Sequence, residues 1–75
     1  MFKLICTSYN ETENGLVLRN NWMEDCKNDS HLSEFINKWE LPDDFKYPSK
    51  GSISNILCGK MDLDNVVIHV RIIRF

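Results

Sequence analysis

The segment NVVIHVRIIRF, residues 65–75, decides the fold because it carries the strongest strand pattern in the chain. Alternate residues of a strand lie on the same face of a sheet. The even-numbered residues of this segment are all apolar, so we predict that they line the core: Val66, Ile68, Val70 and Ile72. The opposite face combines apolar side chains with one histidine and one arginine: Val67, His69, Arg71, Ile73 and Phe75.

Three further strands are expected before this one. Residues 2–9 (FKLICTSY) alternate, and Asn14-Gly15 is a strong turn dipeptide because both residues tolerate positive φ. Residues 2 to about 20 therefore predict a hairpin. Residues 52–61 predict a third strand, and residues 62–65 predict the turn into the last one.

One helix is expected between the hairpin and the third strand. Leu32, Phe35, Ile36 and Trp39 recur at helical spacing and form one apolar stripe. Asp29 or Ser30 can cap the start of this helix, and Pro42 ends it because proline disfavours the helical conformation in the residue before it. Residues 22–28 are ambiguous, and their spacing is compatible with a single short helical turn.

These elements predict an α+β fold in a single domain spanning residues 1–75. The expected architecture is a small antiparallel sheet of about four strands with one helix packed on one face, in the order β-β-α-β-β. A chain of this length buries only about 60% of the surface that its unfolded form exposes. We therefore expect a domain of marginal stability with one small core.

The charge of the chain favours protein partners over nucleic acid. The formal net charge is −2, whereas proteins that bind duplex nucleic acid usually carry a basic field. Residues 24–44 contain seven acids and only two lysines. No apolar run approaches the ~18 residues that a membrane span needs, so no membrane partner is expected.

The cysteines indicate a cytoplasmic protein with free thiols. Cys6, Cys26 and Cys58 are odd in number, and the first residues do not resemble a signal peptide. Cys6 and Cys58 lie within strand patterns, where a free cysteine packs as a small apolar residue. We expect Cys26 to be more exposed.

No pattern in the sequence predicts an enzyme, a metal site or a cofactor. The cysteines and the two histidines match no paired-ligand spacing. The stretch Asp62-x-Asp64-Asn65 resembles the start of a calcium loop but lacks the glycine and the distal glutamate. The three glycines are too scattered to form a phosphate-binding loop.

The remaining function is binding of another protein. Arginine and aromatic side chains within an apolar patch are enriched at interface hot spots. We therefore predict two partner-binding surfaces, one on the last strand and one acidic: His69, Arg71, Ile73 and Phe75, and Glu24, Asp25, Asp43 and Asp44.

Three other interpretations remain open. The last strand, with Tyr9 beside it, could stack the bases of single-stranded nucleic acid. The chain could be a structural subunit of a homodimer, and a last strand at the edge of the sheet would offer unpaired backbone groups for self-association or strand addition. The loop carrying Phe45 and Tyr47 could instead cover the odd-numbered face of the last strand.

In size and layout, though in no motif, the chain resembles the compact proteins with which phages and other mobile elements block host machinery, including anti-CRISPR proteins. This resemblance covers the whole chain and rests on no diagnostic residue. It implies a small inhibitor that works by occupying the surface of a partner protein.

Overall fold

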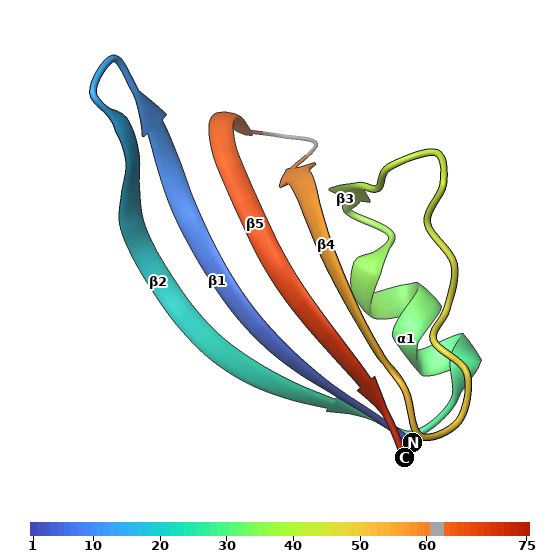
Figure 1. Cartoon of the computed structure of the whole chain (residues 1–75). Coiled ribbons are helices and arrows are strands. Elements are labelled where there is room, and N and C mark those ends of the chain that lie inside the picture. Colours follow the sequence, from blue (N-terminus) through green and yellow to red (C-terminus); the bar gives the residue numbers. More distant parts are fainter. Residues whose placement is uncertain (61–62) are drawn as a thin grey trace.

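The computed structural model describes residues 1–60 and 63–75, and over these residues it contains five strands and one helix. The elements are β1 (Phe2–Thr12), β2 (Gly15–Cys26), α1 (Asp29–Ile36), β3 (Trp39–Glu40), β4 (Ile53–Lys60) and β5 (Leu63–Arg74). The strands form one sheet in the order β2-β1-β5-β4-β3, and every neighbouring pair is antiparallel. The last strand, β5, therefore lies inside the sheet between β1 and β4, and the expectation that it forms a sheet edge is wrong. The sheet curls into a half-barrel (Figure 1).

The predicted α+β class is wrong, because the protein is mostly sheet. The predicted sheet of about four strands has five in the described residues, and the order is β-β-α-β-β-β rather than β-β-α-β-β. The helix ends at Ile36, and Trp39 pairs with Lys60 as part of β3. Trp39, which the apolar pattern assigned to the helix, therefore belongs to a strand. Helical spacing of apolar residues does not by itself fix the conformation of a short segment.

The hairpin is longer than predicted. Its turn lies where Asn14-Gly15 placed it, between Thr12 and Gly15. The second strand, however, continues through Trp22 to Cys26 and stays paired with β1 along its length. The helical turn considered for this region is therefore not formed, because β1 supplies partners for the backbone groups of the whole segment.

The curl of the sheet has two causes. Strands of 11 or 12 residues accumulate the right-handed twist that every strand carries. In addition, the register between β1 and β2 shifts at Ser8/Tyr9, which is an irregularity of the kind that bends a strand and increases its twist. Figure 1 shows the result as three long strands that bow together, with α1 on the inside of the bend.

The core lies on this inner, concave side. The predicted core face of β5 is confirmed, because Val66, Ile68, Val70 and Ile72 are all buried. On β1, Leu4, Cys6 and Ser8 lie opposite Ile72, Val70 and Ile68 and are also buried, as is Phe2 at the start of the strand. Helix α1 contributes its two buried residues, Leu32 and Ile36, to the same cluster.

Helix α1 begins at a different cap from the two residues considered in the sequence. Asn28 is the N-cap, and its side-chain Oδ1 accepts a hydrogen bond from the backbone N–H of His31 at 2.9 Å. The backbone N–H of Lys27 in turn donates to Nδ1 of His31 at 3.1 Å. These two bonds fix the point at which the chain leaves β2 and enters the helix.

The loop between β3 and β4 packs against the core side of the sheet. The Tyr47 ring lies 5.4 Å from that of Phe45 and 6.4 Å from that of the buried Phe2. The Arg74 guanidinium sits 5.2 Å above the Phe2 ring and donates a hydrogen bond to the carbonyl of Pro48 at 3.3 Å. This end of the molecule also holds both chain termini, since the N–H of Phe75 donates to the carbonyl of Met1.

Part of the predicted turn before β5 lies outside the described residues. This applies to Asp62, and so to the start of the stretch that resembles a calcium loop, and also to Met61, the last residue of the predicted third strand. The remaining turn residues, from Leu63 to Asn65, belong to β5, and Asn65 has a left-handed backbone conformation with φ of 65°.

Candidate functional site

The outer, convex face of the sheet carries the odd-numbered residues of β1, β4 and β5. The strand register aligns these residues in rows that run across the sheet. One row joins Met23, Ile5, Arg71 and Asn55. The rows on either side are Asp25, Lys3, Ile73 and Ile53, and Asn21, Thr7, His69 and Leu57. Side chains from four strands therefore meet around Arg71.

Large apolar side chains on this face are exposed to solvent. The exposed fraction is 64% for Met23, 61% for Leu57, 56% for Ile53 and 61% for Phe75. Exposed apolar residues are ordinary when scattered, but a continuous group bordered by polar residues marks an interaction surface. We call Met23, Ile53, Leu57, Ile73 and Phe75, together with the central Arg71, the outer patch.

Arg71 lies at the centre of the outer patch with most of its hydrogen-bonding capacity unused. Within residues 1–60 and 63–75, the structure records one side-chain hydrogen bond for it, from Nε to Oδ1 of Asn55 at 3.4 Å. A guanidinium has five N–H donors in a planar fork. The donors on its two terminal nitrogens therefore remain available to an acceptor on another molecule.

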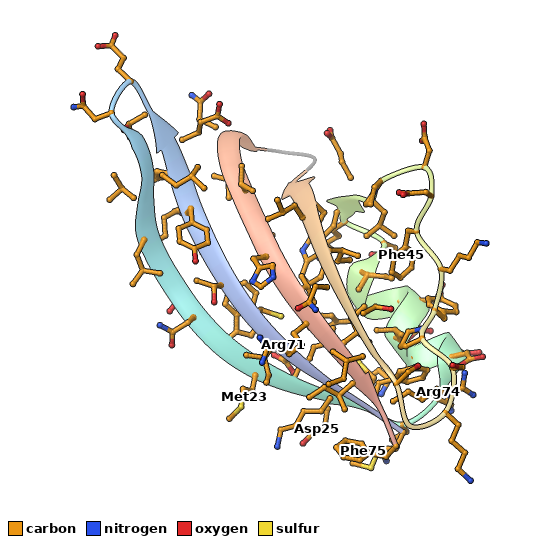
Figure 2. All side chains as sticks on the ribbon, in the orientation of Figure 1. Met23, Asp25, Phe45, Arg71, Arg74 and Phe75 are labelled. Atoms are coloured by element: carbon orange, nitrogen blue, oxygen red, sulfur yellow. The ribbon has the colours of Figure 1, made fainter. Side chains whose placement is uncertain are left out.

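The structure brings together some of the predicted partner-binding residues and separates others. His69, Arg71 and Ile73 share the outer face, as the alternation predicted, and Phe75 follows the end of β5 and is exposed beside Met1. Asp25 joins them in the row of Lys3, one strand further from β5, and Figure 2 labels it together with Met23, Arg71 and Phe75. Glu24 faces the other way, opposite Leu4, while Asp43 and Asp44 lie in the loop after β3. The four acids therefore do not form one surface.

Sequence reasoning missed Met23, Ile53 and Leu57. Met23 lies in the segment that is ambiguous in the sequence, so its face could not be assigned. Ile53 and Leu57 belong to β4, where alternation places them on the face opposite Ile56 and Cys58. The sequence shows this alternation, which separates two faces of β4. It does not show that the face with Ile53 and Leu57 lies beside the outer face of β5, because that depends on the strand order.

The loop carrying Phe45 and Tyr47 does not cover the outer patch. Both aromatic rings are on the core side, where Phe45 packs against the core cluster and Tyr47 approaches Phe2. Figure 2 shows Phe45 and Arg74 on the side of α1, away from Arg71. The interpretation in which this loop covers the odd-numbered face of β5 is therefore wrong.

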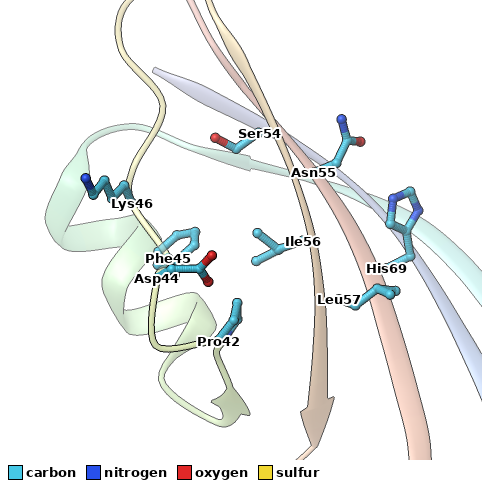
Figure 3. Close-up of a pocket in the computed structure, with 9 residues that line it drawn as sticks. All are labelled: Pro42, Asp44, Phe45, Lys46, Ser54, Asn55, Ile56, Leu57 and His69. Carbon is cyan, nitrogen blue, oxygen red and sulfur yellow. The ribbon is translucent and has the colours of Figure 1, made fainter.

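A groove lies between β4 and the loop that follows β3. Its volume is about 700 Å³, and its walls come from Pro42, Asp44, Phe45 and Lys46 on one side and residues 54–57 of β4 on the other. Figure 3 shows the Phe45 ring and the Ile56 side chain facing each other across it. His69 lies at the rim, so the groove adjoins the outer patch.

All three cysteines are buried. The expected burial of Cys6 and Cys58 is confirmed, whereas the expected exposure of Cys26 is wrong, because its side chain ends β2 against the core with 1% exposed. Burial raises the pKa of the Cys6 thiol to about 12 and that of Cys58 to about 11. Burial, followed by the nearby carboxylates of Glu24 and Asp25, also raises the pKa of Cys26. The thiolate is the reactive form, so none of the three is placed to act as a nucleophile.

This burial predicts slow thiol modification in the folded state. At pH 8 we expect iodoacetamide to label the native protein at least tenfold more slowly than the protein in 6 M guanidinium chloride, where all three thiols react. Mass spectrometry of tryptic peptides measures each site separately. Rapid labelling of Cys26 in the native protein would show that the end of β2 opens in solution.

Within the described residues, no three histidine, cysteine, aspartate or glutamate side chains gather in a way that could hold a metal ion. The same part of the chain has no helix long and apolar enough to cross a membrane. No family model, curated protein or solved structure matches this chain.

Proposed function

We propose that the protein is a non-enzymatic binding module that docks another protein on its outer patch. The observation that carries this proposal is the cluster of exposed apolar side chains around Arg71. Met23, Ile53 and Leu57 come from strands on both sides of β5 and are each more than half exposed. Burying such side chains against a partner is favourable, by about 25 cal/mol for each Å² of apolar surface removed from water.

The charge of the patch indicates the chemistry of the partner. Arg71 and Lys3 lie near its centre, whereas Asp25 lies on β2 at one side. A carboxylate on the partner could pair with the two terminal nitrogens of Arg71 in a bidentate arrangement. We infer a partner surface with an aspartate or glutamate surrounded by apolar side chains.

Single-stranded nucleic acid fits this face less well. Tyr9 lies opposite Val67, so the span of β5 from Val67 to Phe75 separates the two aromatic side chains on this face. At about 3.4 Å per residue, that span is roughly 27 Å. Stacking platforms for successive bases lie much closer together, and the net charge of −2 opposes binding of a phosphate backbone.

The more specific role, inhibition of host machinery by a protein of a phage or another mobile element, is supported by the small size of the chain. The layout that suggested this role was the α+β arrangement, which the structure corrects. The proposal of protein binding does not depend on that layout, because it rests on the outer patch.

The expected result of Arg71→Glu is loss of partner binding with the fold retained. A hot-spot arginine contributes about 2 kcal/mol or more, so affinity should fall at least ~30-fold. Arg19→Glu is the matched control, because Arg19 is exposed and lines a depression on the core side with Trp22 and Ile68. It should change affinity less than about threefold.

The measurement has two stages. Tagged wild-type protein is used to capture partners from cells of the organism that encodes it, and the affinity of each purified partner is then measured by calorimetry for the wild type and both variants. Equal affinities for the wild type and Arg71→Glu would contradict the proposal. A fluorescence shift with single-stranded oligonucleotides at about 50 mM salt would favour nucleic acid, and a stable dimer in light scattering would favour a homodimer subunit.

A further inference from the structure

The β4 edge of the sheet is incompletely paired. β3 pairs with β4 only at Trp39–Lys60 and Glu40–Gly59. Pro42 follows two residues after β3 and has no N–H to continue the ladder. Among the described residues, β4 therefore has a strand neighbour on one side only, β5, from Ile53 to Cys58.

The hydrogen-bonding pattern shows which backbone groups of β4 face this free edge. The N–H of Arg74 donates to the carbonyl of Ser52 at 3.1 Å, so position 52 bonds towards β5. Antiparallel ladders alternate between bonded and non-bonded positions. The backbone groups of Ser54, Ile56 and Cys58 therefore point towards β5, and those of Ile53, Asn55 and Leu57 point outward.

The groove described above runs along this free edge. An extended chain takes up on the order of 160 Å³ per residue, from the spacing of residues, strands and packed sheets. The groove volume of about 700 Å³ thus corresponds to roughly four residues. Phe45 and Ile56 would contact the side chains that point to the core side, and Leu57 would lie beside those that point to the outer side.

The opposite edge of the sheet carries features that discourage strand addition. β2 has the register irregularity near Arg19, the charged Asp25 on its outer face and the charged Glu24 turned to the core side. Irregularities and inward-pointing charges are common ways of protecting an edge. The β4 edge from Ile53 to Cys58 (ISNILC) has no charged residue, no proline and no register shift.

We infer that the groove beside β4 binds an extended peptide segment of a partner protein as an added strand. The peptide continues the sheet where β3 stops, bonding to the outward backbone groups of Ile53, Asn55 and Leu57. Its side chains alternate, with apolar residues at the positions that face Phe45 and Ile56. This site is separate from Arg71 in its chemistry, because it relies on main-chain hydrogen bonds.

Two substitutions of Asn55 test the main-chain bonds. Asn55→Pro removes an N–H that faces the free edge and leaves the β5 ladder intact, and Asn55→Ala is the matched control that keeps the N–H. The probe is a phage-displayed library of random heptapeptides selected on the wild-type protein. We expect enriched peptides with alternating apolar residues that bind Asn55→Ala like the wild type and Asn55→Pro at least tenfold more weakly.

A second measurement does not depend on how Asn55→Pro folds. A selected peptide, synthesised with N-methyl groups on the alternate amides that face β4, should lose at least tenfold in affinity, whereas methylation of the other amides should be tolerated.

Hydrogen exchange of the free protein is a third measurement, and it should show fast exchange of the amides of Ile53, Asn55 and Leu57 and slow exchange of those of Ser54, Ile56 and Cys58. Peptide binding should slow the first set.

Three outcomes would overturn the inference. The first is a selection without enrichment, and the second is binding that is insensitive to both Asn55→Pro and peptide methylation. The third is a wild-type dimer in light scattering that becomes monomeric in Asn55→Pro, which would assign the edge to a second copy of the chain. Arg71→Glu should leave peptide binding within about threefold, so failure of the outer-patch proposal and failure of this one are distinguishable.

Discussion

Val70→Asp is expected to prevent folding. Val70 is fully buried in β5, and its partners across the sheet are Cys6 on β1 and Ile56 on β4. None of these side chains can compensate a carboxylate, and burying an unpaired charge costs several kcal/mol. A domain of this length has a total stability of about 4–11 kcal/mol. The variant should show no cooperative thermal transition by circular dichroism at neutral pH.

Arg71→Asp is the control for this substitution. It introduces an aspartate one position further along β5, on the outer face, where its carboxylate stays in contact with water. The cost should be under about 1 kcal/mol, from the low strand propensity of aspartate. Equal damage by the two substitutions would show that β5 is not divided into a core face and an outer face.

Phe2→Ala is expected to have the second-largest effect. Phe2 is 1% exposed, and it contacts Tyr47 of the β3–β4 loop as well as the Arg74 guanidinium. Removing a buried phenylalanine ring costs about 3–5 kcal/mol. Here the loss also frees the loop that forms one wall of the groove, so weaker peptide binding at β4 should accompany the lower stability.

Phe75→Ala provides the comparison, because the two residues lie at the same end of the molecule. Phe75 is 61% exposed and belongs to the outer patch, so its removal should change the free energy of unfolding by less than about 0.5 kcal/mol. Urea denaturation of both variants measures the difference. A loss of partner binding by Phe75→Ala without a loss of stability would place Phe75 in the interface, whereas a large loss of stability would give it a packing role.

The two faces of β5 were predictable from the sequence, and so was most of the first hairpin. Strand alternation has a period of two, so Val66, Ile68, Val70 and Ile72 had to share a face if the segment was a strand at all. Asn14-Gly15 placed the hairpin turn, where Gly15 takes a φ of 110° that few other residues accept. Both inferences depend only on neighbours along the chain.

The fold class could not be predicted in the same way, and neither could the composition of the outer patch. Trp39 fits the apolar stripe of a helix, yet it lies in β3 because Lys60 of β4 pairs with it. The spacing around Met23 is compatible with a helical turn and does not decide between helix and strand, yet β1 pairs with this segment and places Met23 in a strand opposite Ile5. In each case a partner distant in the sequence decided the conformation, and local spacing carries no information about that partner.

The sequence by itself determined the strand character of residues 66–74, the division of that strand into an apolar face and a mixed one, and the position of the first turn. Only the tertiary structure decided that Met23, Ile53 and Leu57 gather around Arg71, that the loop after β3 packs on the core side, and that β4 keeps a free edge. The physical reason is that side-chain alternation is a property of one strand, whereas strand order, register and curl arise from hydrogen bonds and packing between segments far apart in the chain.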